Sequence, residues 1–408
     1  MLFHIYCTAA VIFFVISIIL LQKNRTAGRA MLTVSTVAFI FPALFYMWVL
    51  SVFYFMYTVL AVICGIITIL LAITILLAIW GQLKKKPIII GAVAAFAICF
   101  TVLFGYKSYR SWLVKVPTVG EGADLLYEYS PLNDQAKTAV LDSPCELKIN
   151  SDFPRLDGAT ALYPVYSAFA NAVYPEYIQR DEQYLTCSTT GNAYNKIVSG
   201  KADIIFVAAP SEKQKQYAES HGVELEFTPI GREAFVFFVN SQNPLENITV
   251  GQIQDIYSGK ITKWSQLGVQ KLGKIKAFQR DEGSGSQSAL LRLMEGKTLT
   301  EPIKDEVSGD MGGIINTVAD YKNFKNAIGF SFRFYCTEMV NNNQIKLLGV
   351  NGVKPTEENV ENGSYPISNS FFAVTRKDKT ENTAHFLEWM QGEQGRELVE
   401  KTGYTPPK

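Results

Sequence analysis

Three long apolar runs dominate the first quarter of the chain. Residues 2–21 are almost unbroken and long enough for one helical span of ~20 residues. Residues 30–80 would reach about 75 Å as a single helix at ~1.5 Å per residue, so this run must turn back once, and residues 50–58 are the expected turn. With residues 88–104 as the last span, the pattern predicts a membrane region over 1–110 with transmembrane helices at about 2–21, 31–51, 57–80 and 88–105.

The pattern changes after this region to short apolar stretches separated by turn residues. Residues 111–144 show no sustained period and are interpreted as a linker. Strands are predicted at the start of 145–175, at the start of 184–211, and over 203–208, 231–240 and 367–376. Helices are predicted from about Ala159, after the turn at 188–191, within 249–264 and over 382–403. Alternating strands and helices favour an α/β fold with a parallel sheet covered by helices.

Charge separates the same two regions. Residues 1–116 contain nine Lys or Arg and no Asp or Glu, which leaves 29 basic and 37 acidic residues, a net charge of −8, in 117–408. The acidic part has no Lys/Arg-rich stripe, so nucleic-acid binding is not expected. Basic residues after the first predicted span (23–29) and after the third (84–86) place both loops in the cytoplasm by the positive-inside rule. Those at 107–115 argue weakly the other way. We therefore expect a multi-pass protein of the cell membrane with its C-terminal domain outside the cytoplasm.

Three polar loops each lie between a predicted strand and a predicted helix. They are Asp-Gly-Ala-Thr at 157–160, Ser-Thr-Thr-Gly at 188–191 and Arg-Asp-Glu-Gly-Ser-Gly-Ser at 280–286. Helix N-termini carry unpaired N–H groups and positive partial charge, which suit an oxyanion. Each Ser or Thr could equally be an ordinary N-cap. Three such loops, one with an arginine, favour an anion-binding site.

Other chemistry lacks the residues that it needs. The serines at 284 and 286 are outside a Gly-x-Ser-x-Gly motif, and His4, His221 and His385 lie in unrelated surroundings. No Cys/His spacing suggests a metal site. We therefore predict no catalytic residue, metal or cofactor, and expect a protein that is not an enzyme. The three cysteines at 145, 187 and 336 allow at most one disulfide, and buried free thiols are the favoured interpretation.

Residues 148–406 resemble the phosphate-binding protein of bacterial phosphate ABC transporters, a type II family of periplasmic-binding-protein-like proteins. The most specific parts are "GQIQDIYSGKITKW" (251–264), "FQRDEGSGSQSA" (278–289), "AIGFSFRFY" (327–335) and "GEQGRELVEKTGYTP" (392–406). The resemblance implies a two-lobed, Venus-flytrap domain over 145–408. Lobe one would comprise 145–231 and 367–408, lobe two 232–366, and the ligand would lie in the cleft. It does not extend to the four predicted spans.

The resemblance also implies particular ligand contacts. Hydroxyl groups, backbone N–H groups and one guanidinium would bind the anion, and an acidic residue would brace the arginine. The residues concerned are Thr160, Ala161, Thr190, Arg280, Glu282, Ser284, Gly285 and Ser286. Glu282 is the bracing residue and stands where the family has Asp.

One position departs from the family. Ala208 stands where the family has an aspartate that accepts a hydrogen bond from protonated phosphate. An ionised carboxylate accepts but cannot donate, so it disfavours an anion without a proton. Without it, we expect phosphate to bind with weaker discrimination against sulfate. The alternative is that another acceptor, such as Glu212 or Glu282, replaces the missing carboxylate.

The expected function is therefore capture of phosphate or a similar tetrahedral oxyanion by a membrane-anchored, extracytoplasmic solute-binding protein. An ABC transporter permease is the partner that the resemblance implies. In the alternative, the four-span bundle relays anion binding to a signalling partner. A hydrolase is the least favoured interpretation.

Overall fold

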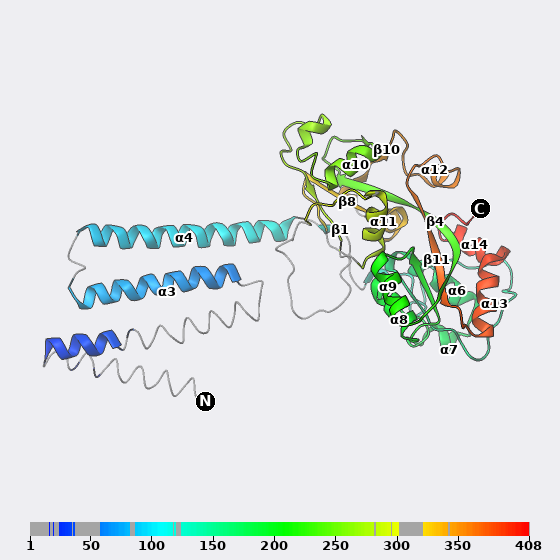
Figure 1. Cartoon of the computed structure of the whole chain (residues 1–408), viewed down its shortest axis with the longest axis horizontal. Coiled ribbons are helices and arrows are strands. Elements are labelled where there is room, and N and C mark those ends of the chain that lie inside the picture. Colours follow the sequence, from blue (N-terminus) through cyan, green and yellow to red (C-terminus); the bar gives the residue numbers. More distant parts are fainter. Residues whose placement is uncertain are drawn as a thin grey trace. The chain divides into compact units, whose positions relative to one another are not determined.

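The structure is a computed structural model that forms two compact units, one up to Lys115 and the other from Val116 onward (Figure 1). Each unit is described by itself. The structure describes residues 16, 19, 24–34, 36, 58–81, 86–116, 118–119, 124–280, 283–294, 296–301, 321–341 and 343–407.

Two long helices form the described core of the first unit. Helix α3 spans Thr58–Ile79 and α4 spans Lys86–Lys115, and the two lie side by side (Figure 1). Pro87 lies in the first turn of α4, where a missing N–H costs no helical hydrogen bond. Exposed apolar side chains cover α4, with Ile90 68% and Phe104 74% exposed. Such a surface is typical of a helix whose solvent is lipid.

The structure bears on the predicted spans only in part. Helix α3 matches the predicted span 57–80. Helix α4 contains the predicted span 88–105 but continues to Lys115, so residues 111–115 of the predicted linker are helical. Within the described residues, one helix, Lys86–Leu113, is long and apolar enough to cross a membrane, and Gly65–Ile79 is a shorter apolar helix. The predicted spans 2–21 and 31–51 lie almost wholly outside the described residues. A four-span bundle therefore stays a prediction.

A seven-stranded mixed sheet organises the second unit. Its order is β2-β3-β11-β4-β8-β6, with β9 also paired to β4. The strands are β2 Leu156–Gly158, β3 Ile204–Ala208, β4 Leu225–Asn240, β6 Lys276–Ala277, β8 Ala327–Phe332, β9 Ile345–Leu347 and β11 Ser368–Arg376. Among the described strands of this sheet, β2/β3 and β6/β8 are parallel pairs and the other pairs are antiparallel. The prediction of a parallel sheet is therefore wrong for the middle of the sheet, because β11 lies antiparallel between β3 and β4.

Strand β4 runs through both halves of this sheet. Up to Ala234 it pairs with β11, and from Phe235 it pairs with β8. Figure 1 shows β4 and β11 side by side in the middle of the domain. Ile367, just before β11, lies beside the point where β4 changes partner, because the Phe235 N–H donates to the Ile367 carbonyl at 2.9 Å. The two halves of the sheet are therefore joined by continuous strands.

Helices connect the strands on both sides of this junction. They are 3₁₀-helix η3 Thr160–Leu162, α6 Tyr163–Val173, α7 Glu176–Gln179, α8 Thr189–Val198, α9 Glu212–Ser220, α10 Val250–Tyr257, α11 Gly285–Met294, α12 Glu357–Glu361, α13 Glu381–Gln391 and α14 Glu393–Lys401. The predicted closing helix over 382–403 is thus two helices, which divide at Gly392. The strand predicted near Tyr184 is reduced to the single bridge Leu156↔Leu185.

The segment interpreted as a linker contributes to the core. Leu125 and Tyr129 are buried in the largest apolar cluster of this unit, together with residues of α6, β3 and α14. The Ser167 hydroxyl donates to the Tyr129 carbonyl at 2.7 Å, and Gln394 Nε2 donates to the Ser143 hydroxyl at 3.1 Å. The segment from Asp124 onward therefore packs as part of the domain. Cys145, Cys187 and Cys336 are free thiols, but of these Cys336 is buried whereas Cys145 and Cys187 are half-buried, so the prediction of buried free thiols holds in part.

Candidate anion-binding site

The site begins at one edge of the sheet, where β2 and β3 end. These strands are parallel, in the register Gly158↔Phe206, so their carboxyl ends face the same side. Ligands of open α/β sheets bind outside the carboxyl ends of such strands. Gly158 is required here, since an added Cβ would lie 2.5 Å from the Phe206 carbonyl oxygen.

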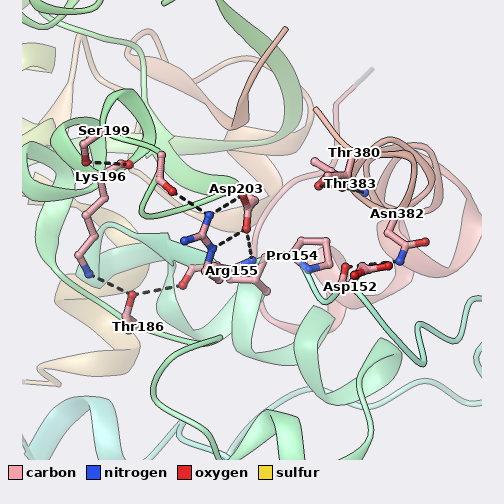
Figure 2. A network of polar contacts seen from close by, with 12 residues as sticks. Asp152, Pro154, Arg155, Thr186, Lys196, Ser199, Asp203, Thr380, Asn382 and Thr383 are labelled. Carbon is pink, nitrogen blue, oxygen red and sulfur yellow. Dashed lines mark hydrogen bonds and ion pairs between the residues drawn. The ribbon is translucent and has the colours of Figure 1, made fainter. Parts of the chain in front are cut away.

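An arginine–carboxylate pair fixes the opposite ends of the two strands (Figure 2). Arg155 Nε donates to Asp203 Oδ2 at 2.8 Å, and its NH2 donates to Asp203 Oδ1 at 2.9 Å. The same NH2 donates to the Gly200 carbonyl at 2.8 Å. A two-pronged pair of this kind restricts orientation as well as distance. It holds β2 against β3 and so sets where the two following loops begin.

A buried aspartate joins the first loop to the second. Asp157 is fully buried and accepts from the backbone N–H of Gly158 and of Ser188, both at 2.7 Å. Its other oxygen accepts from the Ser188 hydroxyl at 2.7 Å and from Lys196 Nζ at 2.6 Å. In Figure 2, Lys196 also reaches the Thr186 hydroxyl. The carboxylate is thus used in holding the loop, and Ser188 is turned toward it.

The second loop carries an unusual backbone conformation. Thr189 begins α8 with φ +74°, which a β-branched residue rarely adopts. Outliers of this kind persist where the surroundings enforce them, often at ligand sites. The N-cap residue Ser188 makes no side-chain capping hydrogen bond to this helix. The first N–H groups of α8, at Thr190 and beyond, therefore lack an intrahelical partner and suit an anion.

The third loop begins α11 with an ordinary N-cap. Ser284 Oγ accepts from the Gln287 N–H at 3.1 Å. The oxygen that was predicted as a ligand contact therefore also caps α11. The Ser286 hydroxyl lies 3.4 Å from that of Ser284, and Ser286 is buried. Gln287 also ties the loop back, because its Oε1 accepts from the Arg280 N–H at 2.9 Å. Arg280 itself is half-buried.

The second and third loops meet. An added Cβ at Gly285 would lie 3.1 Å from Thr190 Oγ1 and 3.5 Å from Ala208 Cβ. One at Gly191 would lie 3.4 Å from the Gly283 carbonyl oxygen. The N-termini of α8 and α11 are therefore directed to one place, beside the end of β3.

A pocket opens at this place. Polar and apolar residues from all three loops, from the joining strands and from the C-terminal segment line it. They are Ala159, Ala161, Leu162, Thr190, Ala208, Glu233, Gly285, Phe332, Asn369, Ser370, Phe371 and Tyr404. The Tyr404 hydroxyl donates to the Ala161 carbonyl and so attaches the C-terminal segment to the first loop.

Some of the predicted ligand residues line the pocket and others do not. Ala161, Thr190 and Gly285 line the pocket. Thr160 faces Cys187, whose Sγ lies 3.9 Å from the Thr160 hydroxyl. Glu282 lies outside the described residues. Of the two acceptors suggested in place of an aspartate at 208, Glu212 is 79% exposed, pairs with Lys215 and does not line the pocket.

Three polar residues of the pocket were missed from the sequence. Glu233 is on β4, and Asn369 and Ser370 are on β11. The amide and hydroxyl residues carry no local signal. Glu233 does carry one, because a charged residue within the apolar strand 231–240 is rarely buried without a partner.

The Glu233 carboxyl has two backbone donors and one cation. It accepts from the Ala234 N–H at 2.9 Å and from the Phe334 N–H at 3.3 Å, and Arg333 Nε lies 3.9 Å from Oε1. Burial raises the pKa of the Glu233 carboxyl to about 7, against the opposing effects of Arg333 and the two N–H groups. Both protonation states are therefore accessible near neutral pH.

This fold and pocket define a class of protein. A mixed α/β sheet in two halves, joined by continuous strands and with helix N-termini around one pocket, is typical of a small-ligand-binding domain. Within the described part of the chain, no group of three or more His, Cys, Asp or Glu side chains could hold a metal ion.

The chain belongs to the PBP superfamily, whose domain model matches residues 152–394. It is 24% identical over 244 residues to the phosphate-binding protein PstS of Staphylococcus saprophyticus, covering 58% of this chain and 73% of the relative. It is 25% identical over 253 residues to PstS of Bacillus subtilis, covering 62% and 79%. A solved ABC-type phosphate transport receptor from Vibrio cholerae matches at 19% identity with a TM-score of 0.44, covering 63% of this chain and 100% of the receptor.

Proposed function

We propose that this protein captures phosphate or a similar tetrahedral oxyanion outside the cytoplasm, as the solute-binding component of an ABC importer. The convergence of Thr190, the N-terminus of α8 and Gly285 of α11 at one pocket carries the proposal. Helix N-termini and hydroxyl donors recognise an oxyanion without any metal. Relatives named as phosphate-binding proteins support the same ligand class.

Arg280 and the loop 283–286 would bind the ligand from one side, and Ala161 and Thr190 from the other. The side containing β2 and β3 corresponds to lobe one, and the side containing α11 corresponds to lobe two. Closure of the two lobes around the anion would place it between the donors and exclude water. The hydroxyls of Thr160, Ser284 and Ser286 and the carboxylate of Glu282 complete the proposed set.

A titration of the purified full-length chain in detergent tests the capture of an oxyanion. We expect phosphate to bind saturably, with sulfate as a competitor, and chloride to have no effect at matched ionic strength. Calorimetry gives the affinity and the stoichiometry, which should be one anion per chain. Absence of binding by phosphate, sulfate and arsenate at millimolar concentration would contradict the proposed function.

The second part of the proposal is that four transmembrane helices anchor the domain. Lys/Arg-rich loops near 23–29 and 84–86 then lie in the cytoplasm and residues 117–408 lie outside. A reporter that is active only outside the cytoplasm should be active when fused after Lys408 and inactive when fused after Arg29 or Lys85. The reverse pattern would contradict both the topology and a role in capturing external anions.

A further inference from the structure

We propose that Glu233 replaces the aspartate that the family has at position 208, and that it shares one proton with the bound oxyanion. The carboxyl group would thus have moved from the end of β3 to β4, and would decide the choice between phosphate and sulfate. This inference rests on the proposed function, because it assigns a role in selecting the anion of the same site.

Position is the first support. Glu233 and Ala208 line the same pocket, together with Thr190 and Gly285. Ala208 ends β3 and presents only a methyl group there, 3.5 Å from where a Cβ at Gly285 would lie. Among the described residues that line the pocket, Glu233 is the one with a carboxyl group. It is therefore the carboxyl group that this lining offers in place of an aspartate at 208.

The hydrogen bonds of Glu233 give the second support. Its carboxyl oxygens accept two hydrogen bonds, which are donated by the backbone N–H groups of Ala234 and Phe334. A neutral carboxyl also has one O–H to donate. Within the described part of the chain, no hydrogen bond uses that proton, so an anion in the pocket would be its acceptor. Since burial brings the pKa of Glu233 to about 7, the proton can come from either partner.

Of Glu233 and the titratable groups around it, Glu233 is the one whose protonation state changes near neutral pH. Arg333 faces it and donates onward to Glu357 on α12 at 2.9 Å and to the Gly403 carbonyl at 3.0 Å. Burial raises the pKa of Cys336 to about 12 and holds that of Tyr404 well above its usual value, so both stay neutral between pH 5 and 9.

The two anions respond differently to the charge on Glu233. Sulfate has no proton in this range, so its binding needs the neutral carboxyl. Above the pKa, its affinity should fall about tenfold per pH unit, the cost of adding one proton. Hydrogen phosphate keeps a proton and can donate it to the ionised carboxylate. The preference for phosphate over sulfate should therefore be small at pH 6 and rise on the order of 100-fold by pH 9.

Competition titrations of the full-length chain at pH 6, 7, 8 and 9 test this inference, with Glu233→Gln as the variant and Glu357→Gln as the matched control. Glu357 contacts the same arginine but is exposed and outside the pocket. We expect the ratio of sulfate Kd to phosphate Kd to rise with pH in the natural protein and in Glu357→Gln, and to stay flat in Glu233→Gln, whose amide can donate to both anions.

Three outcomes are distinct. A ratio that does not change with pH in the natural protein overturns the role of Glu233 but leaves oxyanion capture intact, and this result needs no variant. If the ratio of sulfate Kd to phosphate Kd still rises with pH in Glu233→Gln, the proton belongs to another group and the inference is overturned. Failure of every anion to bind at every pH overturns the proposed function itself.

Discussion

Replacing Arg280 by alanine is expected to weaken oxyanion binding by on the order of 2–4 kcal/mol, the range for removing one partner of a buried charged pair. The guanidinium can hold two oxygens of one anion in a fixed fork, and the backbone of Arg280 is already positioned by Gln287. Arg280→Lys should recover only part of the loss, because an ammonium group lacks the fork. Calorimetric titration with phosphate measures both variants.

Arg396→Ala is the matched control, because Arg396 is exposed on α14 and does not line the pocket. Its affinity for phosphate should equal that of the natural protein. If Arg280→Ala binds as tightly as Arg396→Ala, then Arg280 contributes only to the fold of its loop, and the proposed site loses its main cation.

Replacing Asp157 by alanine is expected to reduce the free energy of unfolding by about 3–5 kcal/mol, the range for breaking a buried ion pair. The change leaves the N–H groups of Gly158 and Ser188 without an acceptor and separates Lys196 from its carboxylate. Because Asp157 holds the first loop to the second, anion affinity should fall as well. Denaturant unfolding followed by tryptophan fluorescence measures the stability.

Asp134→Ala is the control for this change. Asp134 pairs with Arg180 at 2.7 Å but is 83% exposed, and water screens an exposed pair, so its loss should change the stability little. Equal unfolding midpoints for the two alanine variants would mean that the buried network at Asp157 does not organise the loops.

Features set by local sequence were predicted well. The apolar runs that became α3 and α4 could hardly be anything but long helices, and the strand predicted at 203–208 is β3 within one residue. The polar stretches at 157–160, 188–191 and 280–286 do lead into η3, α8 and α11, although their last residues already belong to these helices. Each of these features depends on residues close together in the chain.

Features set by pairing between distant segments were not predicted. Strand β11 follows β3 by some 160 residues and enters the sheet antiparallel, which no local period reveals. The pairing of β11 with β4 brings Asn369 and Ser370 opposite Glu233 and Arg232, and so supplies residues of the pocket. The loops of the site could therefore be predicted from the sequence. The part of the site at β4 and β11 could not, because it depends on the register of two strands far apart in the chain.

The position of a bound anion tests the central claim most directly. Crystals of the protein grown with arsenate, a tetrahedral analogue of phosphate, would show the arsenic atom by its anomalous scattering. The account predicts one peak in the pocket, within hydrogen-bonding range of the Thr190 hydroxyl, the Gly285 N–H and the Arg280 guanidinium through the arsenate oxygens. A peak elsewhere on the domain, with the pocket empty at saturating arsenate, would contradict it.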